Sequence, residues 1–118
     1  MKPILLAILV FCATGAMAAE TRCGWLDNST AANWWLDDRD ASWTIMTQGA
    51  GDEPEGMDNI PDISASNQYV KTNGNHGYTC ACLSVDTDAA AKRITRIYSY
   101  RQLSISKCEN DPSVTRDM

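Results

Sequence analysis

The sequence predicts a small, mostly β domain of antiparallel strands, stapled by two disulfides and containing little helix. Three observations predict this class: an apolar leader that ends at residue 18, four cysteines beyond it, and short β-favouring runs separated by turn residues. About 100 residues follow the leader, which is enough for a single disulfide-bonded domain over 19–118. A domain of this size buries only about 60–65% of its unfolded surface, so cross-links would supply much of its stability.

Residues 1–18 have the pattern of a secretory signal peptide. Lys2 gives a positive start, residues 4–12 are apolar and uncharged, and Ala16 and Ala18 are the small residues that precede a cleavage site. The apolar run is too short to span a membrane. The sequence therefore predicts export to the periplasm, an oxidising compartment.

The cysteines beyond the leader are expected to form two disulfides rather than a metal site or a redox pair. They are Cys23, Cys80, Cys82 and Cys108. Three pairings are open. A Cys80–Cys82 bridge would close a very tight ring, so we expect both to reach outward, to Cys23 and Cys108, in an order that the sequence leaves open. Each bridge is worth about 3–4 kcal/mol in the chain-entropy model.

The first half of the domain predicts a hairpin followed by a loop. Asn33–Leu36 and Ser42–Thr47 are aromatic, β-favouring runs that flank the polar residues 37–40. Residues 49–61 then hold three Gly, two Pro and four carboxylates, a composition typical of a mobile acidic loop. A connection of this length is typical of functional or partly disordered segments.

The second half predicts a second hairpin. A strand over 67–72, a turn at Asn73-Gly74 and a return strand over 77–86 fit the pattern. Strict alternation in the return strand places Cys80 and Cys82 on one face, opposite the face of Ala81, Leu83 and Val85.

The remaining residues predict a turn, one strand and a loose tail. Residues 86–88 form the turn, residues 89–92 add one helical turn, and 94–103 form a strand. Alternation in that strand would place Ile94, Arg96, Tyr98 and Tyr100 on one side. Residues 109–118, after Cys108, are expected to fray.

Charge is unevenly distributed along a chain whose formal net charge is -5. Residues 20–62 carry ten acidic side chains against two basic ones, whereas 63–118 carry five against seven. This argues against nucleic acid and anionic membranes as partners and is compatible with docking onto a basic protein. The alternative interpretation is that the charge simply keeps the protein soluble. The predicted partner-binding residues are Asp37, Asp38, Asp40, Glu53, Glu55, Trp34 and Trp35.

Aromatic and acidic clusters leave other hypotheses open. Trp25, Trp34, Trp35 and Trp43 lie within nineteen residues, and such rings either fill a small core or stack on a cell-wall glycan. Paired carboxylates would support a hydrolase only if a cleft held them about 5–10 Å apart. A lone His76 provides no zinc set and no recognisable nucleophile arrangement, so we expect no cofactor, no metal and no catalytic residue.

Three segments resemble a family of exported bacterial proteins known as domain of unknown function 4087. They are Cys23–Asn28, Ala32–Leu36 with the acidic residues after it, and Cys80–Leu83 preceded by Gly77-Tyr78. The resemblance implies a periplasmic location and supplies no activity, cofactor or catalytic residue. Size and bridge count are also broadly similar to those of periplasmic lysozyme inhibitors, a likeness of class alone. Because the sequence shows no catalytic groups and its first half is acidic, we expect a non-enzymatic binding protein, an inhibitor or immunity factor against a cell-wall hydrolase or toxin.

Overall fold

The structure is a computed structural model and describes residues 19–116. The predicted signal peptide over 1–18 lies outside the described residues. The six strands are β1 (Glu20–Thr30), β2 (Asn33–Asp38), β3 (Ser42–Met46), β4 (Val70–Asn73), β5 (His76–Asp88) and β6 (Arg93–Leu103). The helical elements are the 3₁₀ turns η1 (Met57–Asn59) and η2 (Ile63–Ala65) and the short helix α1 (Ile105–Glu109). The prediction of a mostly β domain with little helix is confirmed.

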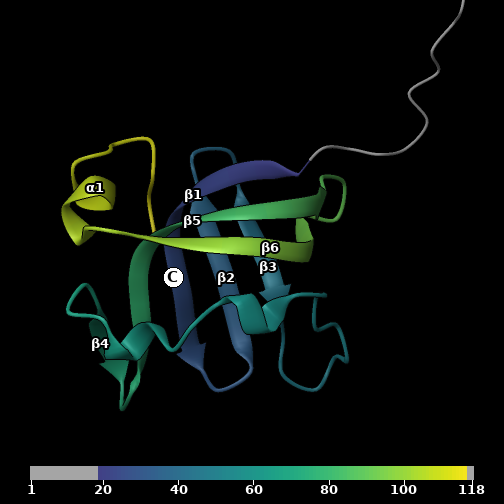
Figure 1. Cartoon of the computed structure of the whole chain (residues 1–118), viewed down its shortest axis with the longest axis horizontal. Helices are drawn as coiled ribbons and strands as arrows, with labels where there is room; N and C mark the ends of the chain where they lie inside the picture. Colours follow the sequence, from purple (N-terminus) through teal and green to yellow (C-terminus); the bar gives the residue numbers. More distant parts are fainter. Residues whose placement is uncertain (1–18, 117–118) are drawn as a thin grey trace, which may run out of the picture.

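Five of the strands close into a barrel. β1 pairs antiparallel with both β2 and β5, β2 with β3, and β5 with β6. A parallel pairing of β3 with β6 at Thr44 and Arg93 completes the circuit β1-β2-β3-β6-β5. In Figure 1, β5 and β6 cross in front of β2 and β3 at a steep angle. This strand order, with its third and fifth barrel strands parallel, is that of an OB-fold barrel. β4 is an additional short strand that pairs with the start of β5.

β1 pairs with β2 on one side and with β5 on the other, and Gly24 allows its backbone to approach β2 closely. The neighbours of Gly24 are Asp37 and Asp38 on β2 and Ala81 on β5. A Cβ at residue 24 would collide with the backbone carbonyl of Asp37. Glycine is therefore required here for the close approach of two backbones.

The barrel interior is one apolar core. Strand side chains that point inward fill it, and the loop residues Ile60 and Ile63 cover one end. The buried strand residues are Leu26, Leu36, Trp43, Ile45, Ala81, Leu83, Val85, Ile94 and Ile97. The predicted facing of the return strand is confirmed, because Ala81, Leu83 and Val85 line the core.

A second, smaller cluster lies outside the barrel wall. Trp25, Cys80, Cys108 and Val114 are buried there, beneath α1 and the chain that follows it. Disulfides join Cys23 to Cys82 and Cys80 to Cys108. The expectation that Cys80 and Cys82 reach outward is confirmed, and the structure decides the order that the sequence left open. The prediction of two disulfides is likewise confirmed.

The first predicted hairpin is confirmed, and the loop after it has more structure than its composition indicated. β2 and β3 pair around residues 39–41. In the 49–61 segment, the backbone of Glu55 forms a parallel β-bridge with Arg96, and η1 follows directly. Ion pairs that the sequence pattern does not reveal fix this segment against β6.

The second half differs from prediction at its turns. The second hairpin turns at Gly74-Asn75, one residue later than predicted, because Asn73 pairs with His76 and Gly74 takes the positive φ of 59°. Residues 86–88 continue β5 rather than turn, since they pair with β6. The connection is the tight turn at 89–92, where no helical turn forms.

The predicted facing of β6 is wrong. Two register shifts along β5 and β6 interrupt the alternation. As a result Ile94 and Ile97 both enter the core, whereas Tyr98 is 45% exposed. A bulge is the physical reason, because it adds a residue that the regular period of two cannot anticipate.

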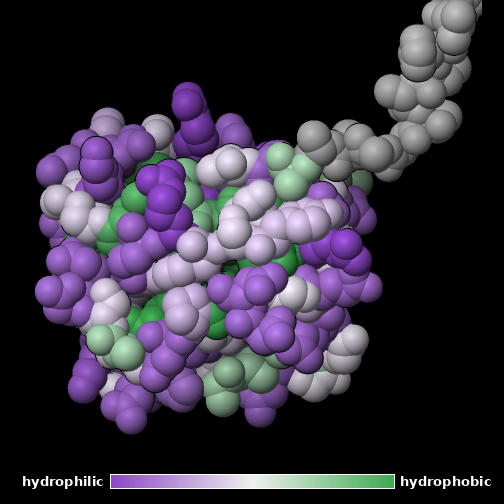
Figure 2. Space-filling model, in the orientation of Figure 1, coloured by the Kyte–Doolittle hydropathy of each residue, from purple (hydrophilic) through white to green (hydrophobic). Residues whose placement is uncertain are grey.

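The prediction of a frayed tail is wrong for residues 109–116. After α1 the chain turns back toward the barrel (Figure 1), and Val114 is buried in the outer cluster. Arg116 forms an ion pair with Asp27 on β1. The last two residues lie outside the described part of the chain. The face of the molecule seen in Figure 2 is mainly hydrophilic, with apolar residues visible in small patches.

Candidate functional site

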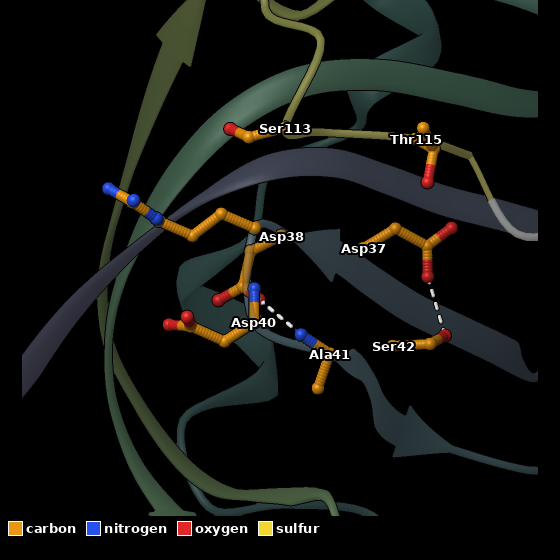
Figure 3. A pocket seen from close by; sticks show the side chains of 8 residues that line it. Asp37, Asp38, Asp40, Ala41, Ser42, Ser113 and Thr115 are labelled. Carbon is orange, nitrogen blue, oxygen red and sulfur yellow. Dashed lines mark hydrogen bonds between the residues drawn. The ribbon is translucent and has the colours of Figure 1, made fainter.

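An acidic pocket of about 350 Å³ lies at the β2–β3 turn (Figure 3). It brings together three of the predicted partner-binding residues, Asp37, Asp38 and Asp40. The turn also contributes Arg39, Ala41 and Ser42, and the C-terminal tail contributes Ser113 and Thr115 from the opposite side.

Asp38 builds the turn on which the pocket rests. Its Oδ1 accepts hydrogen bonds from the backbone N–H groups of Asp40 and Ala41, at 2.8 and 2.9 Å. Its Oδ2 lies 2.8 Å from Nη1 of Arg22, and its side chain is only 3% exposed. Burial alone would raise the pKa of Asp38, but the bonds from Arg22, Ala41 and Asp40 outweigh it and lower that pKa. Asp38 is therefore a structural carboxylate that stays ionised.

Arg22 on β1 connects this turn to the barrel wall. Besides Asp38 it contacts Glu20 at 2.9 Å and Asp40 at 3.1 Å. Its guanidinium carbon lies 4.1 Å from the ring centroid of Trp43, so the ring supports the cation from one side. One guanidinium thus forms ion pairs with three carboxylates. The Asp40 side chain is nevertheless 61% exposed.

Asp37 lies on the outer face of β2, within the pocket. Its Oδ1 accepts a hydrogen bond of 2.5 Å from the Ser42 hydroxyl on β3. Ser113 and Thr115 lie across the pocket from this pair (Figure 3). Carboxylates and hydroxyls that converge on one hollow can accept hydrogen bonds from the ammonium or guanidinium group of a basic side chain.

The acidic residues of the 49–61 segment lie elsewhere and are partly neutralised. Asp52 pairs with Arg93 at 2.8 Å, and bonds from the Thr47 backbone N–H and Arg93 lower its pKa to about 2. Glu55 pairs with Arg96, whereas Glu53 is exposed. The charge imbalance in the sequence is therefore reduced in the fold, because arginines from the second half pair with carboxylates from the first.

The four tryptophans separate into two groups. Trp25 and Trp43 are buried, as expected if these rings fill the interior of a small domain. Trp35 is half-buried on the outer face of β2. Trp34 lines a second pocket of about 330 Å³ at the other end of β2. That pocket also contains Asn28, Pro61, Asp62, Ile63, Ser64, Tyr69, Asn75 and His76.

The residues that the sequence did not reveal include Tyr69, Asp27 and Arg116. Asp27 is fully buried on β1 and pairs with Arg116 at 2.7 Å across 89 positions of sequence. His76 contacts Asn28 through Nδ1 at 3.3 Å, which orients its ring beside the second pocket. No local pattern predicts these pairs, because each joins residues that are far apart in the sequence and meet only in the folded domain.

Across residues 19–116, no group of three or more His, Cys, Asp or Glu residues could hold a metal ion. Over the same range, no helix is long and apolar enough to cross a membrane.

Comparison with protein families gives a match over most of the chain. The family described as "Protein of unknown function (DUF4087)" matches residues 17–115. No curated protein and no solved structure matches this chain.

Proposed function

Because the chain belongs to the DUF4087 family, whose function is unknown, its role has to be inferred from its own site, and we propose that it is a non-enzymatic binding protein. In this proposal it docks onto a basic protein in the periplasm, as an inhibitor or immunity factor against a cell-wall hydrolase or toxin. The observation that carries the proposal is the acidic pocket of Asp37, Asp38 and Asp40 at the β2–β3 turn.

The pocket has two kinds of carboxylate, and they have different tasks. Asp38 holds the turn through Arg22 and two backbone N–H groups. Asp40 is the exposed member, and it would attract a lysine or arginine of the partner during encounter. Asp37 lies deeper, where a basic side chain that enters the pocket would lose water and gain a stronger interaction.

Capture from periplasmic extract at low salt tests this proposal. We expect a basic protein to be enriched on the immobilised, disulfide-bonded protein and to be released near 0.5 M salt, because screening weakens exposed charge pairs. The double variant Asp37→Asn/Asp40→Asn should recover about tenfold less of it. Asp88→Asn is the control, since Asp88 is an exposed carboxylate at the end of β5 and lies outside the pocket lining.

Three outcomes would count against the proposal. The captured protein could be acidic, its binding could be insensitive to salt, or Asp88→Asn could reduce recovery as much as the pocket double variant. Each outcome would mean that the acidic pocket does not recognise the partner.

Glycan binding is a second candidate, favoured by one observation. Trp34 and Tyr69 line the second pocket together with polar groups from Asn75 and Asp62, and such a mixture suits a sugar ring. Oligosaccharide binding is also known for OB-fold barrels, an argument by analogy of fold. Sedimentation with purified peptidoglycan tests it: Trp34→Ala should abolish co-sedimentation, whereas Trp35→Ala should leave it intact. Equal loss in both variants, or no co-sedimentation of the unsubstituted protein, would remove this candidate.

A further inference from the structure

We propose that Asp27 and Tyr78, beneath the C-terminal tail, form an arginine-binding site that Arg116 occupies and that an arginine of the partner takes over. The inference rests on the proposed function, because the same tail forms one wall of the acidic pocket. The partner residue would bind this site through a guanidinium rather than an ammonium group.

The site already holds a guanidinium in a specific geometry. Nε of Arg116 lies 2.7 Å from Oδ2 of Asp27, and the guanidinium carbon lies 3.7 Å from the ring centroid of Tyr78. Tyr78 is held edge-on against Trp25, with ring centroids 5.2 Å apart. A carboxylate beside a flat aromatic face suits the planar, forked guanidinium better than the compact ammonium group of lysine.

The present occupant leaves the carboxylate incompletely satisfied. Asp27 is fully buried, and its Oδ1 has no hydrogen-bond partner among the described residues. Arg116 reaches the carboxylate only through Nε, so just one of the two oxygens is bound. Burial raises the pKa of Asp27 despite the opposing effect of Arg116. An arginine that approached end-on could bind both oxygens at once, which is the stronger arrangement.

The occupant is also placed where it can be exchanged. Residues 111–116 have no helix or strand, and the Arg116 side chain is 26% exposed. The buried Val114 anchors the tail two residues earlier, so Arg116 can leave while that anchor stays. Ser113 and Thr115 line the acidic pocket, and Arg116 directly follows Thr115, so a basic segment seated in the pocket is close to the vacated site.

Titration of the disulfide-bonded protein with N-acetyl-arginine amide, followed by NMR, tests the inference. Arg116→Gln removes the resident guanidinium and keeps the tail length, and we expect it to bind the probe at least tenfold more tightly than the unsubstituted protein. The shifts should appear at the Trp25 indole and the Tyr78 ring. N-acetyl-lysine amide should bind more weakly than the arginine probe.

Lys107→Gln is the matched control, because Lys107 is an exposed cation on α1 and the substitution changes net charge equally. It should bind the probe like the unsubstituted protein. Adding Asp27→Asn to Arg116→Gln should abolish the gain, and the retained dispersion of the spectrum would show that this double variant is folded. If it does not fold, Tyr78→Leu in the Arg116→Gln background replaces it and should weaken arginine binding.

Several results would overturn the inference. They are an Arg116→Gln variant with no gain, equal gain in Lys107→Gln, equal binding of the lysine probe, or shifts confined to residues 37–42. Failure here is distinguishable from failure of the proposed function. If capture of a basic partner still depends on Asp37 and Asp40, the acidic pocket stands and only the arginine site falls.

Discussion

Replacing Asp38 removes the group that ties the β2–β3 turn to β1. Asp38→Ala loses the contact with Arg22 and two hydrogen bonds from backbone N–H groups. Asp38→Asn keeps an oxygen that can accept from the backbone but loses the charge opposite Arg22. Comparison of the two variants therefore separates the ion pair from the turn.

The magnitude follows from burial. The side chains of Asp38 and Arg22 are 3% and 15% exposed, so removing Asp38 leaves a largely buried guanidinium that keeps its contacts with Glu20 and Asp40. Because these two partners remain, the cost is smaller than for a buried charge with no partner. We expect about 2–4 kcal/mol for Asp38→Ala, which also loses two hydrogen bonds from backbone N–H groups, and about 1.5–3 kcal/mol for Asp38→Asn, which loses the ion pair. A domain of this kind has about 5–15 kcal/mol in total. The alanine variant should therefore lose a large part of that stability.

The pH dependence has a definite sign. The pKa of Asp38 is lower in the folded protein than its ordinary value, so the unfolded chain takes up the proton first as pH falls. The stabilisation is complete above the unfolded pKa of about 4 and is lost as pH falls through the folded pKa. The stability difference between the unsubstituted protein and Asp38→Asn should therefore be largest at pH 7 and shrink below about pH 4.

Urea unfolding followed by tryptophan fluorescence at pH 7 and pH 3 measures both effects. Asp88→Asn is the control and should change stability by less than about 0.5 kcal/mol, as exposed positions usually do. A cost for Asp38→Asn below about 0.5 kcal/mol, or a difference that does not shrink in acid, would refute the account of Asp38 as a structural carboxylate.

Three further predictions concern the fold. Gly24→Ala should cost more than about 2 kcal/mol in urea unfolding because its Cβ meets the Asp37 carbonyl, and a neutral result would contradict the backbone approach. Trp43→Ala, at a position 2% exposed, should cost about 3–5 kcal/mol by the same assay, and less than 1 kcal/mol would mean that the ring is not core. Cys80→Ala/Cys108→Ala should lower stability by about 3–4 kcal/mol, since it opens a loop of 28 residues; peptide mapping that found Cys23 bound to Cys80 instead would refute the pairing.

Some of this fold is predictable because its causes are local. The alternation over 79–85 determined which face of β5 carries Ala81, Leu83 and Val85, and the same pattern placed Cys80 and Cys82 together on the other face. The β2–β3 hairpin followed from two aromatic runs around residues 37–40. The acidic pocket contains three residues that the sequence singled out, because they lie next to one another in that turn.

The rest depends on contacts between distant residues. β1 shows no clean alternation, because residues 24–28 are buried on both faces, by the core and by the tail. The bulges in β6 shift Ile97 inward, which no period of two predicts. Arg93, Arg96 and Arg116 neutralise carboxylates 41 or 89 positions away, so the charge of a sequence segment overstates the charge of the surface it forms.

Chemical-shift mapping of the labelled protein with its captured basic partner tests the central claim most directly. The account predicts that the largest changes fall on the backbone amides of residues 37–42 and of Ser113 and Thr115, which line the acidic pocket. Changes centred instead on Trp34, Tyr69 and His76, with the β2–β3 turn unaffected, would contradict it and assign recognition to the second pocket.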